Sequence, residues 1–135
     1  MFIDSSAFIA ILADEPASAV LTAAIQSAKK RYTSPLVRLE TCMRLATKLD
    51  VSPEDAQGAF DKAIDDAAIE ILPITDLMGR EAVAAFSRFG KGRGHPAQLN
   101  IADCFIYACA KAYRSPILCT GNDFAKTDLP LVGRF

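Results

Sequence analysis

The chain has 135 residues, 51% of them hydrophobic, and a formal net charge of −1 at pH 7. This length is typical of one domain with a substantial core, so we predict a single domain over residues 1–135. No apolar run approaches a membrane span and the N-terminus lacks the basic region of a signal peptide, so we expect a cytoplasmic protein without membrane contact. The near-neutral charge neither favours nor excludes a nucleic-acid partner, because a local basic patch can be hidden in the sum.

Short apolar runs alternate with helical patterns along the chain. In chain order we predict a strand at residues 2–3, helices at 7–12 and 17–29, a strand at 32–33, helices at 35–49 and 54–68, a strand at 70–73, helices at 76–89 and 100–113, a strand at 117–119 and a short edge strand within 129–135. The strands lack in–out alternation, which is typical of a parallel sheet buried on both faces. The sequence therefore predicts an α/β fold in which helices cover a short parallel sheet.

The four cysteines show neither CxxC nor zinc-ligand spacing; they are Cys42, Cys104, Cys109 and Cys119. They fall inside predicted helices or a strand. We therefore predict that they are small, reduced core residues of a cytoplasmic protein rather than disulfide partners.

The segment at residues 100–113 is apolar on nearly every side after Asn100, as expected for a helix in the middle of a protein. Asp103 lies one turn into this helix, and a carboxylate is rarely buried unless it is paired, hydrogen-bonded or bound to metal. One explanation is a capping box, in which Asn100 caps the helix and Asp103 bonds back to its amide. The other is a functional site, and the helix alone does not decide between them.

Three further acids stand near the predicted carboxyl ends of strands, where open parallel α/β sheets form their sites. Asp4 follows the first strand, Asp123 follows the strand at 117–119, and Glu40 lies near the start of the helix after the second strand. Asp103 does not follow a predicted strand, so its place at this edge is the least direct step. Each acid alone also has a structural explanation: Asp4 suits a helix cap, and Glu40 suits a surface pair with Arg44 at i+4.

A joint cluster of these four acids predicts a metal site. Like charges at close range cost several kcal/mol at an effective dielectric of about 20, unless protons or a divalent cation neutralise them. Carboxylates without neighbouring His or Cys suit Mg²⁺, with Mn²⁺ as the alternative. Such a cation activates water and stabilises charge on a phosphoryl oxygen, so phosphodiester hydrolysis is the candidate reaction.

The glycine-rich segment GKGRG at residues 90–94 carries basic residues just before the central helix. Such a loop can follow a nucleic-acid backbone, and an ordinary solvated loop is the alternative. The candidate substrate-binding residues are Ser6, Lys91, Arg93, Thr120 and Asn122. His95 is the only histidine of the chain, and we do not expect it to be catalytic.

Four segments together resemble the PIN-domain ribonucleases of the VapC toxin type: MFIDSSAFIAIL, LETCMRLA, KGRG followed by LNIADCFIYACAK, and PILCTGNDFAKTDL. The resemblance spans essentially the whole chain. It implies a three-layer PIN-like fold, with a short parallel sheet flanked by helices, and an acidic Mg²⁺ site. It also implies that the chain is an endoribonuclease, a homodimer, and the toxin of a type II toxin–antitoxin pair with a cognate antitoxin. By motif match, the family's acids fall on Asp4, Glu40 and Asp103, with the fourth at Asp123 or Asn122.

Two departures from the family pattern are visible. Relatives often carry Asp-Thr-Ser where this chain has Asp4-Ser5-Ser6, which keeps a hydroxyl, and the Gly common before the central acid is Ala102 here. If Asn122 faces the site instead of Asp123, the site has three carboxylates and a weaker metal affinity.

Three other functions are alternatives to the ribonuclease function. A phosphatase of the haloacid dehalogenase type needs a second Asp two residues after the first, where this chain has Ser6. A receiver domain needs a phosphoacceptor Asp at the end of a middle strand, and Asp4 follows the first strand instead. A catalytically inactive interaction module of the same fold is the third alternative.

Overall fold

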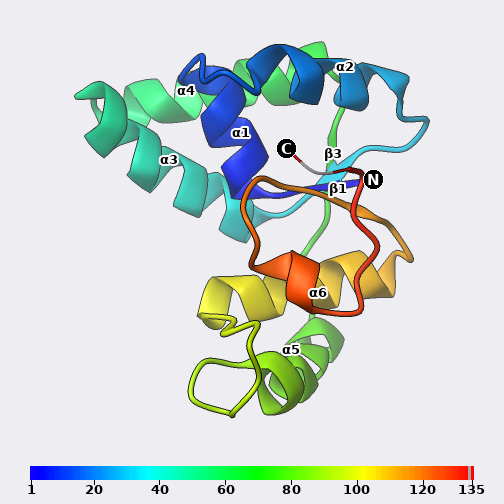
Figure 1. Cartoon of the computed structure of the whole chain (residues 1–135). Helices are drawn as coiled ribbons and strands as arrows, with labels where there is room; N and C mark the ends of the chain where they lie inside the picture. The colour runs from blue at the N-terminus through cyan, green and yellow to red at the C-terminus, as the bar shows by residue number, and fades with distance from the viewer. Residues whose placement is uncertain (134) are drawn as a thin grey trace.

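A small parallel sheet lies between two groups of helices in the computed structural model, which describes residues 1–133 and 135 (Figure 1). The strands are β1 (Phe2–Ile3), β2 (Tyr32–Thr33), β3 (Glu70–Ile71) and β4 (Ile117–Leu118), and their order in the sheet is β3-β2-β1-β4. All neighbours run parallel; Phe2 of β1 pairs with Tyr32 of β2 and with Ile117 of β4. The predicted α/β class and the parallel sheet are confirmed.

The helices are α1 (Ser5–Leu12), α2 (Ser18–Ser27), α3 (Pro35–Leu49), α4 (Pro53–Asp66), α5 (Asp76–Phe89) and α6 (Ile101–Ala112), with a 3₁₀ turn η1 (Phe124–Lys126) after β4. In Figure 1, α1 to α4 lie above the sheet, and α5 and α6 lie below it. Helix α1 packs on α2, α3 and α4, and α5 packs on α6. The three layers expected from the family resemblance are therefore present.

Side-chain caps fix where most helices begin. Ser34 accepts a hydrogen bond from the backbone N–H of Val37 at the start of α3, and Ser52 and Thr75 act in the same way for α4 and α5. These hydroxyl groups satisfy backbone donors that have no partner within the helix. The predicted starts of these three helices are therefore correct to within one residue.

Helix α2 is shorter than the predicted range 17–29, and the reason is Arg31. The Arg31 guanidinium donates hydrogen bonds to the backbone carbonyls of Gln26 (2.9 Å) and Ala67 (2.6 Å), and its Nε donates to Ala28 (3.2 Å). Ala28 takes an extended conformation, so the helix ends before the basic run. The basic residues Lys29, Lys30 and Arg31, which the sequence suggests as a helix end, instead form a connection that Arg31 links to the end of α4.

Residues 103–110 of α6 lie in the core, with Phe105 half-buried, as the sequence predicts, whereas Ile101 is 80% exposed and Lys111 and Ala112 at the other end are exposed. All four cysteines are free and buried. Within the described residues, none of the helices combines the length and apolarity that a membrane crossing demands. The tail adds one isolated bridge, Leu131 to Ile117, in place of the predicted edge strand, and residue 134 of that prediction lies outside the described residues.

Two fully buried threonines give opposite stability predictions. Thr33 Oγ1 donates to the Ile3 carbonyl (3.0 Å), whereas Thr41 Oγ1 has no hydrogen-bond partner within the described residues. Thr41→Val should therefore raise the free energy of unfolding by about 1 kcal/mol, because a buried hydroxyl without a partner costs stability. Thr33→Val should lower it by about 1 kcal/mol, since a satisfied bond is lost. Denaturant unfolding of both variants tests this; equal effects would contradict the assignment.

Candidate active site

The parallel sheet brings three acid-bearing segments to its carboxyl edge. Asp4 follows β1 directly, and its backbone N–H donates to the Leu118 carbonyl of β4 (3.0 Å). The chain after β4 leads to Asp123, and α3, which carries Glu40, begins two residues after β2. Helix α6 leads into β4 and must run back along the sheet, so its first turn, with Asp103, starts at the same edge; α6 also packs on α3.

Asp4 is both a helix cap and a buried acid at this edge. It is 6% exposed, and its Oδ2 accepts hydrogen bonds from the backbone N–H (3.1 Å) and the hydroxyl (2.5 Å) of Ser6. The Ser6 Oγ in turn accepts a bond from the Thr120 N–H (2.9 Å). Burial raises the pKa of Asp4 above its usual value, the two Ser6 bonds oppose this rise, and the charge of Glu40 adds to it.

Glu40 faces the core more than it faces solvent. Its Oε1 accepts a hydrogen bond from the hydroxyl of Ser5, a residue that is 2% exposed. The predicted surface pair also exists, but Arg44 Nη2 lies 3.9 Å from Glu40 Oε2, and the Arg44 side chain is 60% exposed against 16% for Glu40. Sequence reasoning missed Ser5, because its role depends on how α1 packs against α3.

Asp103 forms the predicted capping box and also lies within range of the other acids. Its Oδ2 accepts from the Asn100 N–H (3.1 Å), and its own N–H donates to Asn100 Oδ1 (2.9 Å). The pKa of Asp103 is raised from 3.8 to about 6, first by burial, against the bond from Asn100, and then by the charges of Asp123, Asp4 and Glu40. The capping and site explanations are therefore not exclusive.

Asp123 is exposed and lies close enough to influence buried groups. Besides its effect on Asp103, its charge helps to raise the pKa of the Cys119 thiol to about 12, where burial is the largest cause and Asp4 the second. Asn122 is exposed beside it. The four predicted acids thus influence one another electrostatically, although the chain places them on four separate segments.

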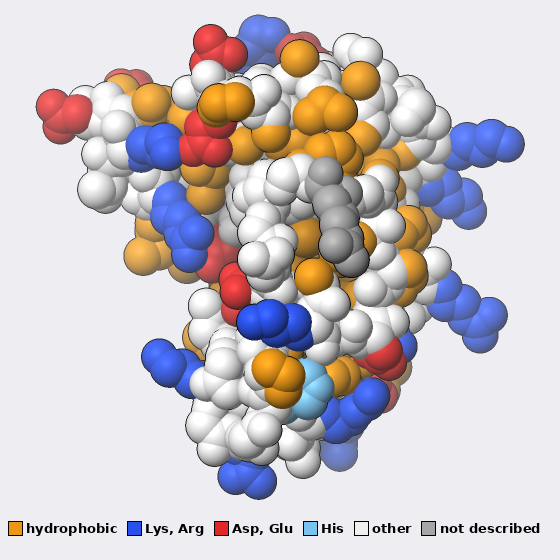
Figure 2. All heavy atoms as spheres, viewed as in Figure 1, with side chains coloured by type: hydrophobic (Ala, Val, Ile, Leu, Met, Phe, Trp, Pro, Cys, Tyr) orange, Lys and Arg blue, Asp and Glu red, His pale blue; other side chains and the backbone are white. Residues whose placement is uncertain are grey.

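This cluster has little compensating positive charge. Among the ion pairs of the described residues, Arg44 with Glu40 is the one that involves any of the four acids. Figure 2 shows acidic side chains on the left of the molecule, where its outline is indented between the α3 side above and the α5–α6 side below. No group of three or more His, Cys, Asp or Glu side chains in residues 1–133 and 135 is placed so that it could hold a metal ion. The acids therefore form an open cluster of charge, not a closed ligand cage.

The candidate residues of the glycine-rich segment, Lys91 and Arg93, lie beside α5 and the start of α6. Lys91 lines an apolar hollow of about 480 Å³ between α5 and α6, together with Ile101. Arg93 lies over the Phe86 ring, 5.7 Å from its centroid. His95 packs edge-on against Phe89, and its Nδ1 accepts from the Ala97 N–H (3.0 Å), so it has a structural role.

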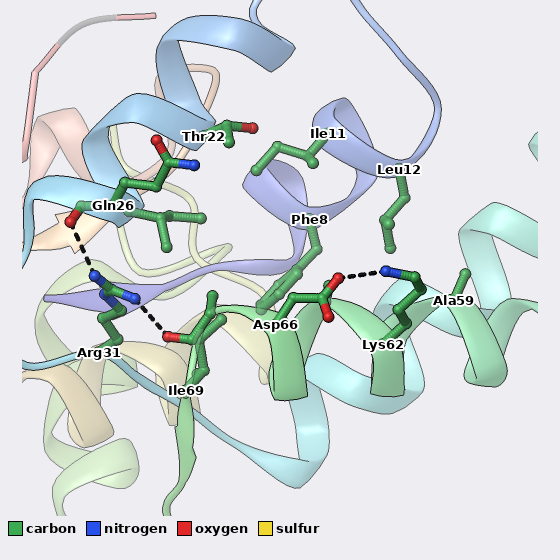
Figure 3. Close-up of a pocket in the computed structure, with 13 residues that line it drawn as sticks. Phe8, Ile11, Leu12, Thr22, Gln26, Arg31, Ala59, Lys62, Asp66 and Ile69 are labelled. Carbon is green, nitrogen blue, oxygen red and sulfur yellow. Dashed lines mark hydrogen bonds and ion pairs between the residues drawn. The ribbon is translucent and has the colours of Figure 1, made fainter.

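A second apolar hollow, of about 440 Å³, lies between α1, α2 and α4 (Figure 3). Phe8, Ile11 and Leu12 of α1 point into it, and Asp66 on its wall is paired with Lys62 (2.5 Å). None of the four clustered acids lines this hollow. The candidate site at the carboxyl edge of the sheet is therefore separate from this pocket.

Comparison with known proteins assigns the chain to a family. The family model described as the PIN domain matches residues 1–129. Ribonuclease VapC28 of Mycobacterium tuberculosis is 41% identical over 127 residues, which cover 94% of this chain and 93% of that protein. The chain is a VapC-type PIN-domain protein. A VapC ribonuclease of Rhizobium meliloti is 37% identical over 140 residues, covering 95% of this PIN domain and 98% of the relative.

Solved structures agree with this PIN fold. The Mycobacterium tuberculosis toxin VapC20, described as cleaving the sarcin-ricin loop, superposes with a TM-score of 0.75 at 16% identity, covering 95% of each chain. A toxin–antitoxin complex from Klebsiella pneumoniae gives a TM-score of 0.72 at 15% identity, covering 99% of this chain and 98% of that one. The family predicted from the sequence is confirmed, and with it a nuclease fold rather than a phosphatase or receiver fold.

The raised pKa of Asp103 predicts how the stability of this PIN domain depends on pH in metal-free buffer. Between about pH 4 and pH 6 the folded state binds more protons at this carboxyl than the unfolded chain, so stability falls as the pH rises through that window. Asp103→Asn should therefore be more stable than the wild type at pH 7.5, by about 1–2 kcal/mol, and the difference should shrink towards pH 4. Thermal and urea unfolding at several pH values measure it.

Asp128 provides a control of opposite sign. The hydrogen bond from the Tyr107 hydroxyl (2.6 Å), followed by that from Lys111 (2.9 Å), lowers the pKa of Asp128. Asp128→Asn should therefore destabilise the protein at pH 7.5, and its deficit should shrink as the pH falls below 4. If both Asn variants lose stability at pH 7.5, the account of Asp103 is wrong.

Proposed function

We propose that this chain is an endoribonuclease that hydrolyses RNA phosphodiesters at the cluster of Asp4, Glu40, Asp103 and Asp123, and that it acts in the cytoplasm as the toxin of a type II toxin–antitoxin pair. The observation that carries the proposal is the convergence of these acids, from four separate segments, at one edge of the sheet of a VapC-type PIN domain. Burial and mutual repulsion raise the pKa of both Asp4 and Asp103, which is typical of functional carboxylates. We treat residues 1–135 as one domain.

The type of donor supports a divalent cation as the cofactor. Carboxylate oxygens suit Mg²⁺ or Mn²⁺, and the uncompensated negative charge favours binding a cation. The two thiols near the cluster, Cys104 and Cys119, are buried, and burial raises their pKa, which disfavours the thiolate form that binds metal. Asp4, Asp103, Glu40 and Asp123 would hold it, with Asn122 as the alternative in the fourth position. When bound, such an ion activates water for attack and stabilises charge on the phosphoryl oxygens.

The residues around the acids hold them in orientation. Ser6 fixes Asp4 and Asn100 fixes Asp103, and in both cases the bonds use Oδ2. The other oxygen of each carboxylate is not engaged by these bonds. Ser5 fixes Glu40 through Oε1 in the same way. Asp4, Glu40 and Asp103 therefore enter the reaction with their rotamers already set, which reduces the cost of assembling the site.

An antitoxin and a second copy of the chain are the partners that we propose besides RNA. The support is the fold shared with the Klebsiella pneumoniae complex, together with apolar side chains left exposed on α2 and α3, among them Val20, Leu39 and Met43. Helices with an apolar face accept an amphipathic partner helix, and a basic residue of such a partner could neutralise the acids by pairing with them. The hollow between α1, α2 and α4 widens this apolar surface.

Replacing either buried Asp should abolish cleavage without unfolding the protein. Asp4→Asn and Asp103→Asn should each lower kcat at least about a hundredfold, because the cation supplies several kcal/mol of transition-state stabilisation. Asp76→Asn, an exposed acid on α5, is the matched control and should retain full activity. The measurement is cleavage of single-stranded RNA with Mg²⁺, with Mn²⁺ and with a chelator. Full activity of either buried variant would refute the site.

Glu40 is the acid for which the surface-pair explanation predicts a different result. If Glu40 belongs to the site, Glu40→Gln lowers kcat at least about tenfold, while Arg44→Gln leaves kcat unchanged and changes at most KM. If it serves only as the partner of Arg44, both variants keep kcat and lose less than about 1 kcal/mol of stability. Steady-state kinetics and thermal unfolding of the two variants distinguish these results.

A further inference from the structure

A groove of about 610 Å³ continues from the proposed site along α3. Ser6 and Thr120 line its inner end, and these are the residues whose hydrogen bonds connect Asp4 to the end of β4. Its outer part is lined by Ile9, Glu15, Met43, Arg44, Thr47 and Lys48. The groove therefore begins next to Asp4, at its hydrogen-bond partner Ser6, and leads away from the acids between α1 and α3.

The outer part of the groove carries two cations on one face of α3. Arg44 and Lys48 are four residues apart, so they lie one above the other, about 6 Å apart along the helix axis. Their side chains are 60% and 49% exposed. In Figure 2, Lys and Arg side chains lie over α3, above the indentation on the left of the molecule.

Each of these cations is paired with an acid. Lys48 Nζ lies 2.5 Å from Glu15 Oε1 in the connection between α1 and α2, and Arg44 lies 3.9 Å from Glu40. Exposed pairs of this kind contribute at most about 1 kcal/mol, so a phosphate group can replace the acid as the partner of Lys48. Glu15 thus competes with an anionic ligand for Lys48.

We propose, building on the ribonuclease function above, that this groove binds the RNA strand on one side of the scissile phosphate, with Arg44 and Lys48 each contacting a backbone phosphate and Glu15 limiting the affinity. The acid cluster repels a polyanion, so an enzyme with this site needs positive charge next to it to hold the substrate. Met43, which is 61% exposed, gives the groove an apolar surface on which a base can lie. Phosphate contacts carry no base preference, so the groove adds affinity and direction but not sequence specificity.

The test measures binding of a fluorescent single-stranded RNA across a salt series, in the cleavage-deficient Asp103→Asn background with Mg²⁺. Adding Lys48→Gln or Arg44→Gln should weaken binding roughly threefold or more, and should reduce the slope of log affinity against log salt by about 0.7 for each lost phosphate contact. Lys62→Gln is the control, because Lys62 lies on α4, outside the groove, and is paired with Asp66 as Lys48 is paired with Glu15. It should change neither value.

Glu15→Gln distinguishes competition for Lys48 from the simple loss of a structural ion pair. It should tighten RNA binding, and the gain should vanish when Lys48→Gln is added, because Glu15 acts through Lys48. Asp66→Asn removes the same charge and releases Lys62 on the α4 surface, so it controls for net charge. If Glu15→Gln and Asp66→Asn tighten binding equally, or if the Lys48→Gln and Arg44→Gln slopes match that of Lys62→Gln, the groove does not bind RNA.

Measurements of RNA cleavage and of partner binding distinguish a failure of the groove proposal from a failure of the ribonuclease proposal. If the wild-type chain cuts no RNA with Mg²⁺ or Mn²⁺, the ribonuclease proposal fails, whatever the binding data show. If the wild type cuts RNA but the salt slopes do not change, only the groove assignment fails. If Lys48→Gln and Arg44→Gln leave RNA binding intact and instead weaken capture of the co-purified partner protein, the groove is a protein-docking surface, and the proposal is overturned.

Discussion

The hydrogen-bonded pairing of β1 with β4 is the constraint on which the site depends. The bond from the Asp4 N–H to the Leu118 carbonyl places an acid and the loop after β4 side by side, although they are more than a hundred residues apart in the chain. In a parallel sheet, a helix that directly follows a strand also begins at the carboxyl edge, as α3 does, and α6 begins there because it runs back along the sheet before β4. Four carboxylates consequently meet there, and the pairing keeps them together although they repel one another.

Helix caps orient two of the four clustered acids, Asp4 and Asp103. A capping hydrogen bond engages one oxygen of the carboxylate and holds the side chain in one rotamer. A catalytic or metal site requires the same fixed rotamer. Asp4 and Asp103 each cap a helix and take part in the cluster. The bond that a capping carboxylate accepts also favours its charged form, which partly offsets the effect of burial and repulsion on its pKa. A capping carboxylate that is buried beside other acids is therefore also a candidate site residue.

Most of the fold, and the placement of the four acids near one edge of the sheet, were predictable from the sequence, because local patterns specify them; the role of these acids stays a prediction. Apolar runs, Ser or Thr caps and first-turn prolines are encoded within a few residues, and the carboxyl-edge rule then groups Asp4, Glu40 and Asp123. What failed needs tertiary contacts. The end of α2 depends on Arg31 reaching the carbonyl of Ala67 on a distant segment, and no periodicity carries that information. The loop at residues 90–94 packs its two cations, Lys91 and Arg93, beside α5 and α6, and its contact with phosphate stays a prediction.

The Ser6 hydroxyl has consequences for which residues this position tolerates. Its Oγ donates to a carboxylate and accepts from a backbone amide at the same time, so the side chain must offer both functions from one atom. Only a hydroxyl does so at this length; alanine offers neither, and an asparagine side chain separates donor and acceptor onto different atoms. Ser5, in contrast, only donates. Two adjacent serines that look equivalent in the sequence therefore carry different chemical requirements: threonine or serine at position 6, and any short donor at position 5.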